Sequence, residues 1–179
     1  MPTHIAFLRA VNVSPRWVKM EVLRTVLQDN GFRDVETYIQ SGNVRVTTAM
    51  RSPAKVETRL REVISREFGF DVPVVARTAA QLREVLRAVE GMESPIGPEA
   101  GRYVTFLSGD LGVEGVQALH DWDVVTEAAR VVGNDVALFL GAGVHGANLT
   151  NARIEKLTGA VGTTRTLTVV RSLVERWCS

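Results

Sequence analysis

Hydrophobic positions along the chain recur with a period of two in some segments and near 3.6 in others, which predicts alternating strands and helices. The first half is expected to hold a strand, a helix, a β-hairpin, a second helix and a fourth strand, over residues 3–9, 19–30, 35–39 with 44–48, 52–69 and 72–77. Strand, helix, two strands, helix, strand is the element order of a ferredoxin-like unit. The first half therefore predicts one complete α+β sandwich.

The second half repeats this rhythm less completely. Thr78 and Gln81 form a capping box for a linking helix, and a stretch rich in Gly and Pro follows. Later elements are expected over residues 103–107, 113–119, 123–131, 135–140 and 148–157, and then over a last helix that carries Leu167, Val170, Val174 and Trp177. Since no strand is recognised before that helix, the second half is expected to be incomplete and to end in helices.

The predicted fold class is α+β, with two ferredoxin-like halves. The expected boundaries are 1–78 for the first half, 79–101 for the linking helix and the Gly/Pro-rich connection, and 102–179 for the second half. The C-terminal helices are expected to pack back on the first half.

Polar residues at the end of the first strand and in the hairpin turn exceed what turning the chain requires. In a ferredoxin-like sheet the first two strands run the same way with the third between them, so both segments reach one edge, about 10 Å apart. We expect a cluster there of Arg9, Asn12, Gln40, Ser41 and Asn43. This set is rich in hydrogen-bond donors, has one fixed positive charge and suits a small anionic or polar ligand.

Three interpretations of this edge cluster stay open. In the first, Asn12 and Asn43 bond to backbone groups of their turns and Arg9 pairs with an acid such as Glu36. In the second, the cluster binds a ligand without reaction. In the third, an enzyme of transferase or hydrolase type stabilises a developing anion with Arg and amide donors. Neither segment contains a Cys, His, Asp or Glu, so the residues name no nucleophile or base.

Two further residues are candidates. Thr163 to Thr166 indicate the capped start of the last helix, and Arg165 within them would join Arg9 if that helix packs over the first half. Trp17 would stack on a ring if it were exposed, although packing of its indole against the first helix is the favoured interpretation.

Composition argues against other classes of function. The formal charge is +1, from 21 Lys plus Arg and 20 Asp plus Glu, so no overall field attracts nucleic acid or membrane. A local nucleic-acid contact through Arg59, Arg61 and Arg66 is disfavoured because glutamates interleave them. The three histidines have no ligand spacing, so we expect no metal and no cofactor. The single cysteine indicates a reducing compartment, and we expect a cytoplasmic protein.

A recurring set of residues occupies segments 8–13, 20–23, 34–43, 104–108, 149–152 and 163–165. In these segments the chain resembles the family catalogued as domain of unknown function 1697. The resemblance implies a bacterial-type cytoplasmic α+β protein with two ferredoxin-like halves and an activity that the family leaves open. The chain departs from the family pattern at Val13 to Trp17, where glycines and a lysine are usual, at Ala147 and Asn148, where a serine and a lysine are usual, and at Thr166 to Thr168, where Asn-Trp-Asn is usual.

Overall fold

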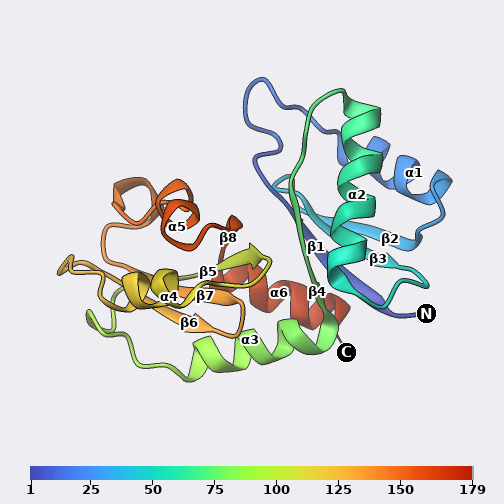
Figure 1. The fold of residues 1–179 in the computed structure, drawn as a ribbon. Helices are drawn as coiled ribbons and strands as arrows, with labels where there is room; N and C mark the ends of the chain where they lie inside the picture. Colours follow the sequence, from blue (N-terminus) through green and yellow to red (C-terminus); the bar gives the residue numbers. More distant parts are fainter. Residues whose placement is uncertain (179) are drawn as a thin grey trace. The chain divides into compact units, whose positions relative to one another are not determined.

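The computed structural model of the protein describes residues 1–178. Its chain forms two compact units, one of residues 1–82 with Trp177 and Cys178, and one of residues 83–176. Each unit is an α+β body built on one four-stranded antiparallel sheet (Figure 1). Over residues 1–178 no helix has both the length and the apolar character that crossing a bilayer requires.

The first unit follows the predicted order of elements. It contains β1 (Thr3–Leu8), α1 (Met20–Asp29), β2 (Arg33–Tyr38), β3 (Asn43–Thr47), α2 (Pro53–Phe68) and β4 (Val74–Thr78). The strand order is β2-β3-β1-β4, and β1 pairs antiparallel with both β3 and β4. Helix α2 ends at Gly69, whose φ of +77° is the left-handed conformation that glycine adopts freely. The glycine at this position therefore stops the helix.

One hydrophobic core lies between the first sheet and its two helices. Leu23 and Leu27 of α1 and Leu60 of α2 are fully buried and share this core with Ala6 and Val44 of the sheet. Burying a leucine side chain contributes about 1.5–3 kcal/mol relative to exposing it. The 3.6-residue spacing that predicted the helices is thus the spacing of their buried faces.

The capping box predicted for the linking helix is confirmed. Gln81 Oε1 accepts from the Thr78 N–H at 2.9 Å, and Thr78 Oγ1 accepts from the Gln81 N–H at 3.2 Å. Helix α3 (Ala79–Gly91) begins between these two residues. Each side chain satisfies a backbone donor that the first helical turn leaves unpaired.

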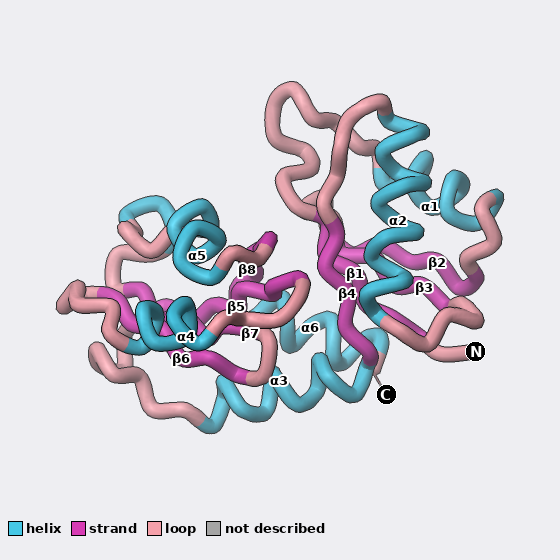
Figure 2. The backbone as a smooth tube through the Cα atoms, viewed as in Figure 1, coloured by secondary structure: helices cyan, strands magenta, loops and turns pink. Residues whose placement is uncertain are grey.

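The second unit has a complete four-stranded sheet (Figure 2). Its elements are β5 (Gly101–Ser108), α4 (Val113–His120), β6 (Glu127–Val132), β7 (Asp135–Leu140), a short 3-10 helix (Val144–Gly146), α5 (Asn151–Thr158), β8 (Val161–Thr166) and α6 (Leu167–Trp177). The strand order is β6-β7-β5-β8, with β8 antiparallel to β5. The prediction that this half is incomplete was therefore wrong.

The reason for this error lies in the threonines of β8. Threonine serves both as a helix N-cap and as a β-branched strand residue, and the two uses look alike in sequence. Only Thr166 caps α6, by accepting from the Val169 N–H at 3.2 Å, while the residues before it pair with β5. Gly162 pairs with Leu107 in this strand, and a glycine suits the position because a Cβ there would lie 2.7 Å from Leu107 Cδ2.

Candidate functional site

The two polar segments of the first unit meet at one edge of its sheet, as the chain order predicts. The N–H of Leu8, at the end of β1, donates to the carbonyl of Gly42 at 2.8 Å. Phe7 lies opposite Asn43 in the β1–β3 register. The approach is close, since a Cβ on Gly42 would lie 2.7 Å from Val11 Cγ2. The segment after β1 and the turn before β3 therefore form one packed surface.

Asn12 holds three pieces of chain together at this surface. Its Nδ2 donates to the Gln40 carbonyl at 2.7 Å, and its Oδ1 accepts from the Val18 N–H at 2.9 Å. Its own N–H donates to the carbonyl of Arg16 at 2.7 Å. One residue thus connects the hairpin turn to both sides of the segment that carries Trp17. The first interpretation expected Asn12 to bond to backbone groups of its own turn. The Asn12 side chain does bond to backbone groups, but both of these groups lie outside that turn.

The backbone of these loops is strained. Ala10, Asn12 and Ile39 have φ of +54°, +56° and +52°. Asparagine tolerates this left-handed region, but alanine and the β-branched isoleucine rarely occupy it. Such residues cost about 1–3 kcal/mol each and persist where surrounding contacts enforce them, often at functional sites. The strain falls at the same edge that the polar residues mark.

A hollow of about 470 Å³ opens beside Asn12. It is lined by Asn12, Trp17, Val18, Lys19 and Gln40, with mainly apolar walls. Its volume falls within the range of roughly 300–1,000 Å³ that small-molecule sites occupy. Within residues 1–178, the ammonium of Lys19 forms no ion pair and the side-chain amide of Gln40 forms no hydrogen bond. One positive charge and one amide are therefore available to a ligand there.

The predicted site residues of the first unit differ in their relation to this hollow. Asn12 and Gln40 line it. Arg9 is half-buried, with its N–H donating to the Pro73 carbonyl at 3.0 Å. Ser41 is exposed, and its Oγ accepts from Asn43 Nδ2 at 3.1 Å.

Asn43 lies beneath the turn, with no exposed surface, and also donates to the Tyr38 carbonyl at 3.0 Å. These two bonds of its amide hold the turn, which agrees with the structural interpretation for this residue. Glu36 accepts from Arg45 Nη1 at 2.5 Å through one carboxylate oxygen and from Trp177 Nε1 at 3.0 Å through the other. The acid suggested as a partner for Arg9 therefore has both oxygens engaged elsewhere.

Arg165 lies in the second unit, on β8, and its membership of the edge cluster stays a prediction. Its side chain is buried and donates from Nη1 to Thr163 Oγ1 at 2.8 Å and to the Thr164 carbonyl at 2.9 Å. Burial lowers the pKa of its guanidinium to about 10, because desolvation disfavours the charged form. The side chain is still protonated at neutral pH.

Sequence reasoning missed Lys19 and misjudged Trp17. Trp17 is 63% exposed, so the favoured packing against the first helix was wrong. Lys19 is the residue before α1, where a positive charge is not a helix-capping signal. That mismatch with capping preference was the one sequence signal that could have identified it.

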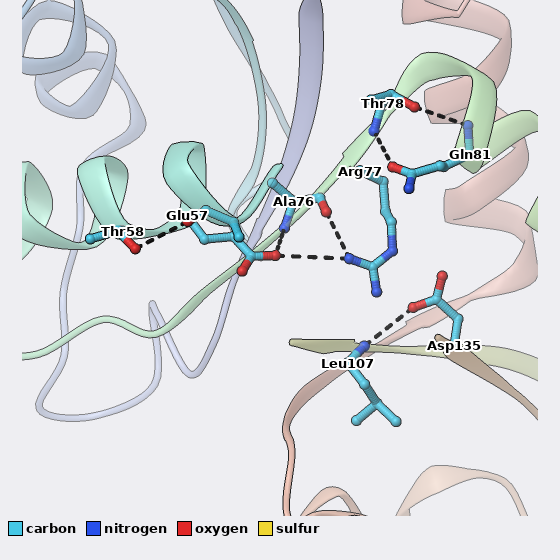
Figure 3. A network of polar contacts seen from close by, with 9 residues as sticks. Glu57, Thr58, Ala76, Arg77, Thr78, Gln81, Leu107 and Asp135 are labelled. Carbon is cyan, nitrogen blue, oxygen red and sulfur yellow. Dashed lines mark hydrogen bonds and ion pairs between the residues drawn. The ribbon is translucent and has the colours of Figure 1, made fainter. Parts of the chain in front are cut away.

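Other polar groups of the first unit are used to build the fold. Glu57 on α2 accepts from the Ala76 N–H at 2.8 Å and lies 3.8 Å from Arg77 Nη1, as Figure 3 shows. Strand β4 is at the edge of its sheet, so this N–H would otherwise lack a strand partner. Glu57 therefore satisfies an edge donor and fixes α2 to β4.

Three segments that carry the family resemblance meet in the second unit. Thr105 Oγ1 lies 2.7 Å from Thr164 Oγ1, and Thr164 Oγ1 donates to Asn151 Oδ1 at 2.5 Å. These contacts join β5, β8 and the first turn of α5. They account for these polar residues as structural links between the three elements. Among residues 1–178, no group of three or more His, Cys, Asp or Glu side chains is arranged to hold a metal ion.

Known proteins resemble this chain in fold and in sequence. A solved structure of a conserved bacterial protein from Streptococcus pneumoniae has a TM-score of 0.72 to it, with 97% of each chain covered and 17% sequence identity. At that identity the likeness shows the fold alone. No curated protein sequence matches the chain. Residues 1–137 of the 179 match the family described as "Protein of unknown function (DUF1697)", and the chain therefore belongs to that family.

Proposed function

We propose that this protein is a non-catalytic binding protein that holds a small anionic or polar ligand in the hollow beside Asn12. Lys19 supplies the charge, and Gln40 supplies both a donor and an acceptor. Arg9 and Ser41, on the two segments that meet at this edge, add a second positive charge and a hydroxyl. Arg165 remains a further candidate contact from the sequence.

The observation that carries this proposal is a combination of two features: polar side chains without partners in the described chain line the hollow, and hydrogen bonds already hold the backbone at its rim in place. Lys19 and Gln40 have side chains without partners among residues 1–178, while Asn12 fixes the Gln40 backbone through a 2.7 Å hydrogen bond. A ligand that binds such a site loses little free energy to ordering it. Preorganised donors around one charge are what recognition of a small anion requires.

The alternative of an enzyme at the same place is less well supported. The five side chains that line the hollow include no carboxylate, imidazole, thiol or hydroxyl. General acid–base catalysis most often uses a histidine or a carboxylate held within reach of the substrate, and neither lines the hollow. A binding role needs only the donors that are present.

Two finer features belong to the same proposal. Each unit has the order strand, helix, two strands, helix, strand, which supports assigning both as ferredoxin-like. A single cysteine in 179 residues supports a reducing, cytoplasmic location. A fluorescent fusion that localises outside the cytoplasm would contradict the second inference.

A thermal-shift panel tests the binding proposal. The probes are the nucleoside 5′-monophosphates, ribose 5-phosphate and citrate, each added to the wild type and to Lys19→Ala. A ligand at one hundred times its dissociation constant should stabilise the wild type by about 2.7 kcal/mol. Lys19→Ala should weaken binding by roughly 10- to 150-fold, since a hydrogen bond to a charged group contributes about 1.5–3 kcal/mol.

Lys55→Ala is the matched control, because Lys55 is an exposed lysine on α2 that does not line the hollow. It removes the same charge and should leave every shift unchanged. The proposal fails if the wild type responds to no probe, or if Lys19→Ala and Lys55→Ala respond alike.

A further inference from the structure

Trp17 differs from the other two tryptophans of the chain. Trp122 Nε1 donates to Glu127 Oε2 at 2.9 Å and Trp177 Nε1 donates to Glu36 Oε2 at 3.0 Å. Trp17 is 63% exposed, and over residues 1–178 its indole N–H has no acceptor. A tryptophan buries more apolar surface than most side chains when it packs, so leaving it exposed forgoes that stabilisation. The fold leaves most of this residue uncovered.

The backbone on both sides of Trp17 is nevertheless fixed. The carbonyl of Arg16 accepts from the Asn12 N–H at 2.7 Å, and the N–H of Val18 donates to Asn12 Oδ1 at 2.9 Å. The Val18 side chain is 1% exposed and belongs to the core. Because the stem is held, an indole at this position presents its face at a small cost in conformational entropy.

The groups beside this ring are complementary to a heterocycle with a negative charge. Val18 provides an apolar wall, Gln40 an amide and Lys19 an ammonium, all on the same hollow as the indole. The neighbouring Arg16 is engaged elsewhere, with its guanidinium 5.8 Å from the centre of the Phe70 ring. An aromatic face, an amide and a cation can together contact a stacked base, its polar edge and its phosphate.

We propose that the ligand of this hollow is a nucleoside monophosphate or a similar phosphorylated heterocycle, stacked on the Trp17 indole with its phosphate toward Lys19. This inference rests on the proposed function and narrows its ligand class. Gln40 would read the edge of the base, and Asn12 acts as a positioning residue that sets the two loops. Exposed apolar side chains nearby, Val13 and Ile39, would suit a protein partner, but the unused amide and ammonium favour a small charged molecule.

Isothermal titration calorimetry separates the ring from the phosphate. The probes are the four common nucleoside 5′-monophosphates, ribose 5-phosphate as the phosphate without a ring, and adenosine as a ring without a phosphate. The best nucleoside monophosphate should bind the wild type at least about tenfold more tightly than ribose 5-phosphate, because only the nucleotide stacks. Because stacking on an aromatic side chain stabilises a bound base, Trp17→Ala should lower the affinity for the nucleotide by roughly 5- to 150-fold.

Trp17→Phe keeps an aromatic face and should retain most of the affinity, while Trp17→Leu keeps only apolar volume and should not. Far-ultraviolet circular dichroism of each variant checks that the fold is intact. Because the bound base would stack on the indole of Trp17, it should quench the fluorescence of that residue, and this quenching should disappear in Trp17→Phe.

The outcomes distinguish this inference from the proposed function. Stacking on Trp17 is overturned if ribose 5-phosphate binds as tightly as every nucleotide. It is also overturned if Trp17→Ala changes the nucleotide affinity less than about twofold, because stacking predicts a larger loss. In either case an anion site at Lys19 stands. If no probe binds the wild type, both are overturned. Both inferences are supported if a nucleotide binds the wild type, if Lys19→Ala weakens that binding, and if Trp17→Ala weakens it further.

Discussion

Gly42 is the point at which the two polar loops approach most closely, and replacing it with alanine tests that approach. Its φ is +81°, so an alanine there adopts the left-handed conformation at a cost of about 1–2 kcal/mol. The new Cβ would lie 2.7 Å from Val11 Cγ2 and 2.8 Å from Leu8 Cβ. Both neighbours are buried, and overpacking of this kind typically costs about 1–3 kcal/mol. The free energy of unfolding should therefore fall by about 2–5 kcal/mol.

Gly69→Ala supplies the control. Gly69 has a φ of +77°, and a Cβ added there would meet no atom within 4 Å, so this variant carries the backbone strain without the clash. Its expected loss is about 1–2 kcal/mol. Urea unfolding followed by circular dichroism gives both values from the midpoint and slope. Equal losses for the two variants would refute the close packing of the loops, and with it the ordered rim of the hollow.

Two further substitutions test groups outside the hollow. Glu127→Gln should destabilise the second unit by about 2–4 kcal/mol in urea, because the buried carboxylate accepts from the Trp122 indole and from two backbone N–H groups; an unchanged midpoint would contradict this. Asp71 has a pKa held below its ordinary value of 3.8 by its hydrogen bond to Arg61, so its stabilisation is present above that value and is lost as pH falls through the lower folded pKa. Wild type and Asp71→Asn should therefore converge in stability from about pH 5 to about pH 2, and parallel urea curves across that range would count against the ion pair.

Local patterns predicted most of the secondary structure. Apolar positions three and four apart indicated α1 and α2, and their buried residues are the ones that the pattern selects. The capping box of Thr78 and Gln81 was recognised because both partners lie within one helical turn of each other. Structures that are determined by residues within one helical turn or one hairpin can be predicted from the sequence, because all the residues that determine them are close together in the chain.

Strand β8 shows where local reading stops. Its threonines fit a helix start as well as a strand, and what selects the strand is pairing with β5, where Thr105 lies opposite Thr164 at a separation of 59 residues. No neighbouring residue carries that information. The choice between two equally acceptable local structures was made by a partner that only the folded chain brings alongside.

The edge site divides in the same way. The order of elements along the chain alone predicted that the segment after β1 and the turn before β3 would meet. Because β1 and β3 pair antiparallel, the end of β1 and the start of β3 lie side by side. Which side chains face outward there depended on the fold: Asn43 is buried under its turn, whereas Trp17 is left exposed above a held backbone. Exposure is set by what the rest of the chain places over a residue, and neither the identity of an asparagine nor that of a tryptophan determines it.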